Sequence, residues 1–384
     1  MTIVGIRPDF IRMSEIIKEL DRTPDCKHIL VHTGQHYSKQ ANDVFFDELG
    51  IREPDINLNI GSGTHAVQAA KVFEALDNTI DEQKPDVCVF LGDSNASIGA
   101  VVPSKRNILT VHIEGGMRSY DNSLPEEKNR RIIDSCSDLI LVYTDFYRES
   151  LLLENIPDRK IKVVGNTIVE VLKNNLSKAL AKDTLKRLGL KEKEYILSTI
   201  HRNVSVDDPG ILKSIFKGLS EGAKEINLPV VISLWFRTVA RIKEFGIEIP
   251  DNFKVIEPLG FLDFLNLEKN AKLIVSDSGT VCEEACWLHV PCIVPRLSIE
   301  RQEVLWNKSS FLAGQDSEYI KKCMLKANKM KTGWDHSWME KPNTAKQCVK
   351  HIMELKPSLS TLYDDTDERR LKSWFKYWEK AQDL

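Results

Sequence analysis

Residues 87–116 read VCVFLGDSNASIGAVVPSKRNILTVHIEGG, and this stretch decides the fold. It contains two apolar runs, Val87–Leu91 and Asn107–Ile113, each of a length typical of one buried strand. The residues between them form a crossover, so the two strands are predicted to be parallel. Asp93 and Glu114 follow the two strands directly. Because parallel strands end at one edge of their sheet, both carboxylates are expected on the same rim.

The alternation of strand and helix continues on both sides of this stretch. In the first half, strands are expected at Thr2–Val4, His28–His32, Leu139–Tyr143 and Lys162–Val164, and helices at Asp9–Leu20, Ser38–Leu49, His65–Gln83 and Pro125–Ser135. After a lysine-rich helical stretch the pattern restarts, with strands at Tyr195–Ile200, Val230–Leu234, Lys254–Ile256, Leu273–Ser276 and Cys292–Val294, and helices at Pro209–Glu221, Asp263–Lys269 and Val281–Leu288. The pattern predicts an α/β fold of two Rossmann-like, doubly wound domains with a central cleft.

The chain is predicted to divide into three parts. The first domain covers residues 1–167 and the second, opening with the helical stretch Ile168–Leu190, covers residues 168–356. Residues 357–384 contain a charged helix with four aromatic side chains, which is typical of an amphipathic helix that packs on the body of the protein. A nucleic-acid stacking surface would need a basic excess around these rings, which the sequence lacks.

The composition is that of an ordinary globular protein. Of the 384 residues, 42% are hydrophobic and 28% are charged, and the formal net charge is −3. A charge so close to zero gives no bulk attraction to nucleic acid or to an anionic membrane, so phosphate must be bound by local groups. No stretch approaches the ~20 apolar residues that span a bilayer, and no signal peptide is predicted. A cytoplasmic protein is expected.

Eight cysteines are scattered through the chain, and several lie inside apolar runs. This distribution is typical of reduced core residues in a reducing compartment. Cys282, Cys286 and Cys292 form the one cluster. A metal site there would lack a convincing fourth ligand, since His289 is the only neighbour, so the three are predicted to be buried structural thiols.

A third acid, Glu126, follows soon after Glu114, in the first turn of a helix that begins at Pro125. Each of the three acids also has a purely structural interpretation, because acids commonly cap or start helices. Their convergence on one rim favours a functional site. Carboxyl groups that crowd together push their pKa values apart, as paired acid and base roles require.

Three sets of groups could bind phosphate at the same cleft. Arg7 follows the first strand, and Arg12 lies about one turn further along the next helix. His201 and Arg202 follow the first strand of the second half. Residues Ser276–Thr280 end a strand and start a helix, where free N–H groups and the helix dipole attract a diphosphate.

Glu283 and Glu284 lie in the first turns of that last helix, where a carboxylate could accept both hydroxyls of a ribose. The alternative is ordinary helix-start chemistry. Other nucleotide and hydrolase motifs are absent: no G-x-G-x-x-G follows the first strand, and there is neither a P-loop lysine motif nor a serine nucleophile elbow.

Ten short segments, in order, resemble the non-hydrolysing UDP-N-acetylglucosamine 2-epimerase family over nearly the whole chain. They are GIRPDFIRM, HTGQHY, LGDS, IEGGMRS, PEEKNR, VVGNT, HR, IEPLGFLDF, SDSGTVCEEA and, at residues 300–303, ERQE. Each alone is weak evidence, but their order across two domains is specific.

The resemblance implies the glycosyltransferase-B-like fold, in which the last helix crosses back onto the first domain. Members work without metal or nicotinamide and usually as dimers, so no cofactor and a homodimer are expected. Their reaction removes the proton on carbon 2 and expels UDP, leaving a bound 2-acetamidoglycal. UDP then adds back, and carbon 2 is reprotonated from the other face. Such chemistry needs acids and bases on both faces of the sugar and firm retention of UDP.

The resemblance also implies roles for particular residues. Asp93, Glu114 and Glu126 match the family's catalytic acids, and His201 matches a histidine that contacts the diphosphate and supports the departure of UDP. Among the binding residues, Glu284 matches the ribose-binding glutamate. The residues expected to bind the UDP-linked amino sugar are Arg7, Arg12, Gln35, His36, Arg118, Arg130, Arg237, Ser278, Gly279, Thr280, Glu284 and Arg301. No metal ligand is expected.

Three segments depart from the family pattern. HR-x-E-N becomes His201–Ser205, with Val204 in place of the glutamate, H-P-R-T becomes Trp235–Thr238, and GTRPE becomes GIRPD. In bacterial members, the histidine that Trp235 replaces belongs to a second site where substrate acts as an activator. That regulation is therefore in doubt here, whereas the three acids and Glu284 are retained.

The opening MTIVGIRPDFIRMSEIIKELD and the SDSGT segment resemble more closely the branch that acts on UDP-linked L-configured 2-acetamido-2,6-dideoxyhexoses. These enzymes convert L-rhamnosamine to L-quinovosamine, or L-pneumosamine to L-fucosamine, for surface glycans. A 6-methyl group suits an apolar pocket, to which Trp235 and Phe236 could contribute. Three alternatives stay open: a UDP-N-acetylglucosamine/UDP-N-acetylmannosamine epimerase, a hydrolysing relative, and a UDP-sugar-binding protein without catalysis.

Overall fold

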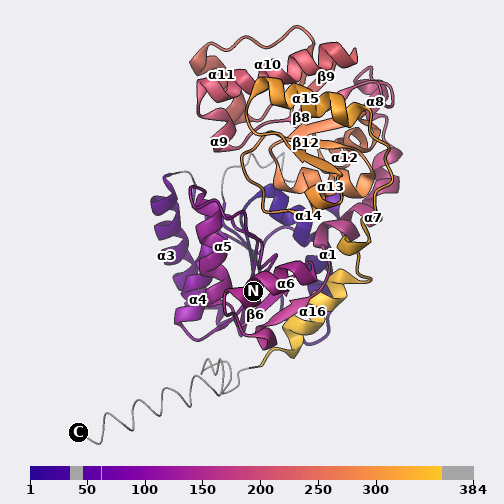
Figure 1. Ribbon diagram of the computed structural model, residues 1–384. Helices are drawn as coiled ribbons and strands as arrows, with labels where there is room; N and C mark the ends of the chain where they lie inside the picture. Colours follow the sequence, from indigo (N-terminus) through magenta and orange to yellow (C-terminus); the bar gives the residue numbers. More distant parts are fainter. Residues whose placement is uncertain (35–45, 62, 357–384) are drawn as a thin grey trace, which may run out of the picture.

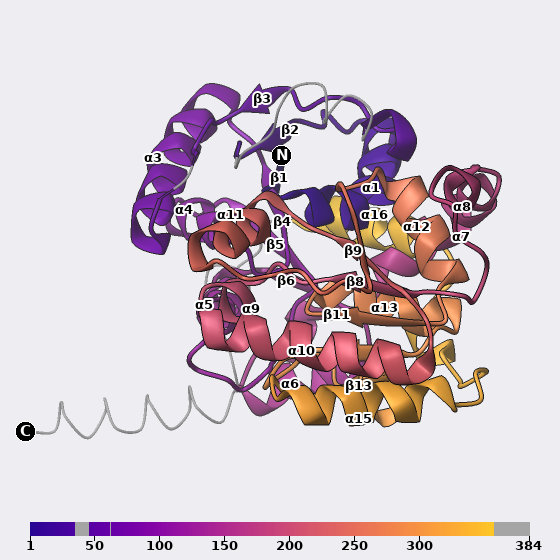
Figure 2. The same cartoon turned by 90° about the horizontal axis from the view of Figure 1, so that it is seen from above.

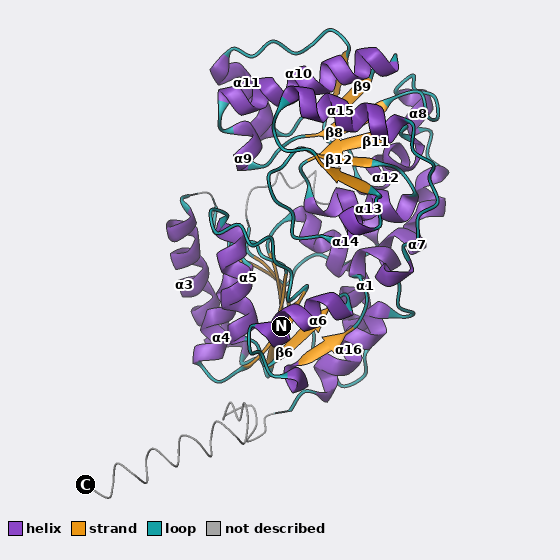
Figure 3. Cartoon of the chain, viewed as in Figure 1, coloured by secondary structure: helices purple, strands orange, loops and turns teal. Residues whose placement is uncertain are grey.

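The computed structural model describes residues 1–34, 46–61 and 63–356, which form two α/β halves, each built round one sheet (Figure 1). The first sheet has seven strands in the order β3-β2-β1-β4-β5-β6-β7, and the second has six in the order β10-β9-β8-β11-β12-β13. Within the described residues, all paired strands are parallel. Figure 3 shows the strands inside each half with helices outside them. The predicted pair of doubly wound sheets is confirmed.

The first half is built from short strands and longer helices. Its strands are β1 (Thr2–Val4), β2 (Leu30–His32), β3 (Ile56–Asn57), β4 (Val87–Leu91), β5 (Leu109–Ile113), β6 (Leu139–Val142) and β7 (Ile161–Val163). Its helices are α1 (Arg7–Arg22), α3 (His65–Gln83), α4 (Val101–Lys105), α5 (Pro125–Cys136) and α6 (Asp145–Leu153), with 3₁₀ turns at Ser97–Ala100 and Asp158–Lys160.

The second half repeats the plan. Its strands are β8 (Ile196–Thr199), β9 (Val230–Ser233), β10 (Phe253–Ile256), β11 (Leu273–Ser276), β12 (Cys292–Val294) and β13 (Ser310–Leu312). From the linker onward the helices are α7 (Thr167–Leu180), α8 (Thr184–Arg187), α9 (Asn203–Val206), α10 (Pro209–Ile226), α11 (Phe236–Phe245), α12 (Phe261–Asn270), α13 (Gly279–Leu288), α14 (Glu303–Trp306), α15 (Ser317–Asn328) and α16 (Thr344–Glu354), with a 3₁₀ turn at Ser337–Met339.

The strand pair β4–β5 brings its two carboxylates to one edge, as predicted. The strands run in register from Val87 opposite Leu109 to Leu91 opposite Ile113. Glu114 then turns sharply, with φ at 74°, and its backbone N–H donates to the Leu141 carbonyl at 3.0 Å. A non-glycine residue in this left-handed region is strained, and such strain concentrates at functional sites.

Most predicted elements of the first half and the central strands of the second are present, with ends shifted by a few residues. The helix expected over Ser38–Leu49 falls mainly outside the described residues. The strand expected from Asn107 starts at Leu109, because Asn107 adopts a left-handed φ of 55°. The helix expected over Ile168–Leu190 is divided in two, and Asp183 lies between the parts. The sequence prediction did not include β3, β13, α4, α6, α9, α11 and α14 to α16.

Over residues 1–34, 46–61 and 63–356, the chain crosses between the halves twice. Helix α7 packs against α1 and α16 of the first half and against α12 and α13 of the second. Helix α16 packs on α1, and both lie on the same side of the molecule when it is seen from above (Figure 2). The return therefore begins within residues 168–356, before the predicted boundary at residue 357. The predicted terminal helix lies outside the described residues.

The interior agrees with the predicted reduced thiols. Cys282, Cys286 and Cys292 are buried, and all eight cysteines are free. Within the described ranges, no helix is long and apolar enough to cross a membrane. The same ranges contain no group of three or more His, Cys, Asp or Glu side chains that could hold a metal ion.

Candidate active site

Two adjoining cavities lie where the strand ends of the two sheets face each other. The first, of about 380 Å³, is lined by Ile6, Pro8, Arg12, His65, Asp93, Ser94, Asn95, Leu124, Pro125, Glu126, Asn129, His201, Arg202, Asn203, Val204, Ser278, Gly279, Thr280, Glu300 and Arg301. The second, of about 100 Å³, is lined by Arg7, Pro8, Ile11, Thr199, His201, Ser233, Trp235, Leu259, Gly260, Phe261, Phe264, Glu268, Ser278, Thr280, Val281 and Glu284. They share Pro8, His201, Ser278 and Thr280. An elongated ligand could therefore extend through both.

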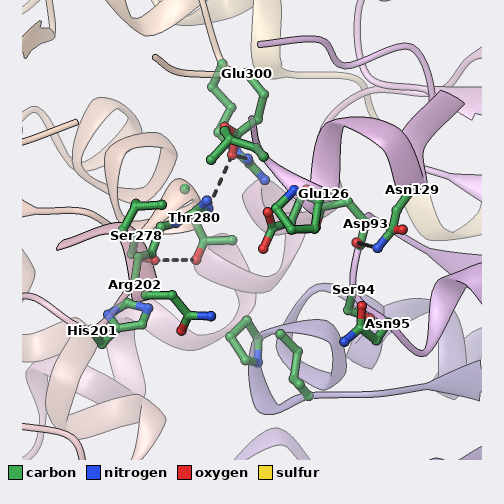
Figure 4. A pocket seen from close by; sticks show the side chains of 18 of the residues that line it. Asp93, Ser94, Asn95, Glu126, Asn129, His201, Arg202, Ser278, Thr280 and Glu300 are labelled. Carbon is green, nitrogen blue, oxygen red and sulfur yellow. Dashed lines mark hydrogen bonds and ion pairs between the residues drawn. The ribbon is translucent and has the colours of Figure 1, made fainter. Parts of the chain in front are cut away.

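The first cavity brings together two of the predicted acids. Asp93 and Glu126 lie on one side of it, facing His201 and Arg202 on the other (Figure 4). The carboxylate of Glu126 has no hydrogen-bond or ion-pair partner within the part of the chain that the structure describes. It is therefore available to exchange a proton with a bound molecule.

Asp93 is held by an ion pair with Arg130, which is itself buried. The backbone carbonyl of Asp93 also accepts a hydrogen bond from the Asn129 side chain at 2.9 Å. Burial, the largest single effect, would raise the pKa of Asp93, but the charges of Arg130, Arg202 and Arg301 together outweigh it and the pKa lies below its ordinary value. Asp93 is therefore ionised near neutral pH.

Glu114 lies behind the wall of the first cavity and does not line it. Its carboxylate pairs with Arg12, with Arg301 at 3.0 Å, and with the Tyr143 hydroxyl, which donates at 3.1 Å. Arg12 and Arg301 do line the cavity. The structure therefore gives Glu114 the position of a group that holds two arginines, one from each half, whereas the sequence prediction made it one of three catalytic acids.

Glu300 lines the first cavity and holds a cluster of arginine side chains in place. The carboxylate is fully buried and pairs with Arg296 at 2.8 Å and with Arg301. Arg202 at 3.5 Å and Arg130 at 3.8 Å complete the cluster. Burial would raise the pKa of Glu300, but the surrounding guanidinium groups hold it well below its ordinary value.

His201 lies at the junction of the two cavities and is positioned by Asp277. The Asp277 carboxylate, fully buried after β11, accepts hydrogen bonds from the backbone N–H of His201 at 3.1 Å and of Arg202 at 2.9 Å. It also lies 3.3 Å from His201 Nδ1. Loss of solvent lowers the pKa of His201 even though Asp277 opposes the shift. The imidazole is therefore neutral near pH 7.

Helix α13 begins at the same junction. Its N-cap residue, Ser278, makes no side-chain capping bond, so the first N–H groups of the helix stay available to an anion. The Ser278 and Thr280 hydroxyl oxygens lie 3.2 Å apart (Figure 4). A Cβ at Gly279 would lie 2.6 Å from Arg301 Nη1 and 2.7 Å from Glu300 Oε1, so a larger residue would have to displace the ends of these two buried side chains.

The second cavity is mainly apolar and aromatic, with a pair of acids in its wall. Arg7 donates to the Leu259 carbonyl at 2.8 Å, and its guanidinium carbon lies 5.9 Å from the centre of the Trp235 ring. Glu268 and Glu284 line the same cavity. An apolar slot with a few polar groups is the usual environment for a base and its ribose.

Some predicted binding residues do not reach either cavity. Arg118 is buried in ion pairs with Asp134 at 2.8 Å and Glu154 at 2.6 Å, and Arg237 pairs with Asp207. Neither arginine lines a cavity. In both places nearby carboxylates pair with the guanidinium group, and the spacing of residues in the sequence does not reveal these pairs. Gln35 and His36 lie outside the described residues.

The apolar pocket expected from Trp235 and Phe236 is not found at the acids. Trp235 lines the second cavity, and Phe236 is 86% exposed. Residue 236 starts helix α11 and lines neither cavity, so the structure gives no support to its predicted role in a methyl pocket. Val204, in contrast, lines the first cavity.

Glu268 and Asn95 were missed by sequence reasoning, and both line cavities. Glu300 and Asp277 lie inside segments that matched the family pattern, but their partners are distant in sequence. Glu268 carried one signal that could have been used, since it is an acid on the otherwise apolar face of α12.

Comparisons with known proteins agree on one family. The profile described as UDP-N-acetylglucosamine 2-epimerase matches residues 18–353. The enzyme of that name from Methanococcus maripaludis is 39% identical over 342 residues, covering 87% of this chain and 93% of the relative. A UDP-2,3-diacetamido-2,3-dideoxy-D-glucuronate 2-epimerase from Pseudomonas aeruginosa is 32% identical over 323 residues, covering 83% and 89%.

A solved structure extends the agreement to the fold. The crystal structure of Methanocaldococcus jannaschii UDP-GlcNAc 2-epimerase in complex with UDP-GlcNAc and UDP superposes with a TM-score of 0.87 at 37% identity. The match covers 92% of this chain and 98% of that chain. Matching segments in order, a profile over most of the chain and two linked cavities lead to one conclusion: the protein belongs to the UDP-N-acetylglucosamine 2-epimerase family of isomerases.

Proposed function

We propose that the protein inverts carbon 2 of a UDP-linked N-acetylhexosamine without hydrolysing it. The observation that supports this most directly is the pair of cavities joined at His201, Ser278 and Thr280. A sugar in the first cavity and a uridine in the second would bring the diphosphate to the open start of α13. This arrangement keeps the leaving group bound while the sugar reacts.

The proposed chemistry uses Glu126 as the base on one face of the sugar, with Asp93 beside it on the same side of the first cavity. Glu126 takes the proton from carbon 2, because its carboxylate is unpaired within the described residues. The C–H electrons form the carbon 1–carbon 2 double bond, and the breaking carbon 1–oxygen bond leaves its electrons on UDP. Re-addition of UDP to carbon 1 then needs a proton on the other face of carbon 2. Solvent supplies this proton and takes up the one held by Glu126, while Asp93 stays ionised through its pair with Arg130.

His201 and the helix start stabilise the departing UDP in this scheme. The neutral imidazole can donate one N–H to a phosphate oxygen, and Asp277 holds its backbone in place. Open N–H groups of α13 and nearby arginines balance the charge that develops on the β-phosphate. Glu114 contributes indirectly by holding Arg12 and Arg301.

The first candidate substrate pair is UDP-N-acetylglucosamine and UDP-N-acetylmannosamine. Relatives of that name support it, and the proposed methyl pocket of Trp235 and Phe236 no longer supports the alternative. The second candidate is a UDP-N-acetyl-L-6-deoxyhexosamine used for surface glycans, favoured by the GIRPDF and SDSGT segments. Both assignments include a homodimer that works in the cytoplasm.

The test offers UDP-N-acetylglucosamine and UDP-N-acetyl-L-rhamnosamine side by side in deuterated water, with carbon 2 followed by NMR. Deuterium at carbon 2 of an intact, inverted UDP-sugar is expected, and the sugar that turns over identifies the substrate. Free UDP with free amino sugar would instead mean a hydrolase. Tight UDP binding without exchange of either sugar would mean a binding protein.

A further inference from the structure

Two buried glutamates face each other in the wall of the second cavity. Glu268 comes from α12 and is 1% exposed, and Glu284 comes from α13 and is 6% exposed. Both line the cavity, and their side chains are hydrogen-bonded to each other. The Glu268 Oε1 atom has no further partner. Two carboxyl groups can form such a bond only when one of them carries a proton.

The surroundings of the pair decide which glutamate carries the proton. Burial raises the pKa of Glu268 well above its ordinary value, and no cation is among the causes that act on it. Burial raises the pKa of Glu284 to about 7, and the hydrogen bond from Glu268 opposes that rise. Glu268 is therefore the donor and stays neutral, whereas Glu284 is the acceptor and becomes ionised as the pH passes about 7.

Other titratable groups, some of them charged, face the pair from several elements. They are Glu283 on the same helix as Glu284, Arg7 and Arg12 at the start of α1, His201 after β8, Arg301 after β12, and Tyr195 and Cys292, which flank Glu268. Arg12 and Arg301 lower the pKa of Glu284, but Glu114 and Glu283 already pair with them. Among the groups that shift the pKa of Glu284, Glu268 is thus the one that donates a hydrogen bond without carrying a charge.

We propose that Glu268 is a positioning residue for the nucleoside, holding Glu284 as a singly charged acceptor for the two ribose hydroxyls. The proposal rests on the proposed function, in which the second cavity receives the uridine. Two adjacent hydroxyls need an acceptor with two oxygens in a fixed orientation. A neutral Glu268 that donates a hydrogen bond to Glu284 fixes the orientation of the Glu284 carboxylate. Because Glu268 is neutral, it adds no second negative charge near the diphosphate.

The proposal predicts how binding depends on pH. A ribose that donates to Glu284 requires its ionised form, so binding tightens from pH 6 to pH 8. The ionised fraction of a group with a pKa of about 7 rises roughly tenfold over that range. Removing the donor while keeping the volume lets the Glu284 pKa rise further, so binding at pH 7 weakens and recovers only at higher pH.

The experiment measures UDP affinity by calorimetry at half-unit steps from pH 6 to pH 9 for the full chain and three variants. Glu268→Gln keeps an N–H donor and is expected to bind like the wild type. Glu268→Leu removes it and is expected to weaken binding about fivefold at pH 7, with the midpoint about one unit higher. Glu284→Gln supplies the baseline, because the UDP phosphate also titrates in this range.

Each outcome bears on the proposal separately from the proposed function. Loss of affinity in Glu268→Leu by the same factor at every pH would mean a packing role and would overturn the proposal. So would a Glu268→Gln variant as weak as Glu268→Leu. Absence of UDP binding in the wild type at all pH values would instead overturn the proposed function.

An infrared difference spectrum keeps the proposal testable even when Glu268→Leu folds poorly. At pH 8 the wild type is expected to show the C=O stretch of a protonated carboxyl that Glu268→Gln lacks. Glu284→Gln should keep that band. A difference spectrum without it would mean that Glu268 is ionised, which contradicts its role as a donor.

Discussion

At the scale of single residues, the adjacent acids Glu126 and Glu127 make different contacts. Glu126 lines the first cavity with its carboxylate unpaired within the described residues. Glu127 points away, is fully buried, and accepts hydrogen bonds from the backbone N–H of Ser119 at 2.8 Å and of Tyr120 at 3.2 Å. It also pairs with Arg130 at 3.0 Å. Glu126 therefore faces the first cavity, and Glu127 holds the loop that precedes the helix.

Glu126→Gln tests the proposed catalytic role. The amide keeps the shape but cannot take a proton, so the rate of carbon 2 exchange is expected to fall roughly 100- to 10,000-fold. UDP affinity and melting temperature should stay unchanged, because no described bond of the side chain is lost. Exchange by NMR in deuterated water and calorimetry with UDP provide the measurements.

Glu127→Gln is the matched control, one residue away. It loses charge-assisted bonds to a buried loop, so it is expected to lower stability by about 1–3 kcal/mol. Chemical unfolding measures this loss. A Glu126→Gln variant that exchanges carbon 2 at the wild-type rate would exclude Glu126 as the proton carrier.

At the scale of elements, the helix start after β11 determines what the cleft can bind. Ser276–Thr280 was predicted as a strand end followed by a helix start, and the structure has both. Close packing behind the first turn was not predictable, because Arg301 and Glu300 approach Gly279 from a loop more than twenty residues later. Spacing along one segment carries no information about such neighbours.

Gly279→Ala tests that packing. The new methyl group would displace the Arg301 and Glu300 side chains, which line the first cavity. Overpacking of this kind costs about 1–3 kcal/mol, so UDP affinity is expected to fall about tenfold or more.

Gly210→Ala gives the matched control for the helix start. Gly210 is exposed in the first turn of α10, where a methyl group meets only the Asp208 carboxylate at 3.1 Å. This variant should bind UDP like the wild type. Equal affinity in both variants would mean that the start of α13 does not contact the diphosphate.

At the scale of the whole molecule, buried polar contacts join the two halves. Glu303 at the start of α14 accepts hydrogen bonds from the Tyr147 hydroxyl at 2.5 Å and from the Thr144 hydroxyl at 3.1 Å. Burial raises the pKa of Glu303 to about 7. The interface therefore favours a protonated carboxyl, and its energy depends on pH.

Glu303→Gln tests this dependence. A carboxyl whose folded pKa lies above its unfolded value stabilises the protein below the unfolded value, about 4.5, and that contribution is lost as the pH rises through about 7. The wild type is therefore expected to lose up to about 3 kcal/mol between pH 5 and pH 8 from this group. The glutamine variant should lose less.

Calorimetric melting at pH 5 and pH 8 measures the difference, with Glu149→Gln as the control. Glu149 is exposed on α6, the helix that carries Tyr147. Its variant should follow the wild type at both pH values. A Glu303→Gln profile parallel to the wild type would mean that the buried carboxyl does not titrate as described.

Sequence predicted the architecture well and the contacts less well. Apolar runs marked the central strands, and the acid after β4 and the helix start after β11 marked the cleft. The burial of Glu114 behind two arginines and the local pairing of Arg118 and Arg237 could not be predicted. Those outcomes depend on side-chain partners from distant segments, and a single sequence carries no record of them.

The double crossing of the chain limits how the molecule can open. The halves are tied at two places, through α7 and through the segment that leads into α16, and both lie beside α1. Two neighbouring tethers prevent the halves from separating as rigid bodies and leave mainly a rotation about the line between them. Most of the entropy of bringing the halves together is thus lost on folding. A ligand needs to restrict only that remaining rotation, so closure can be fast and reversible in every catalytic cycle.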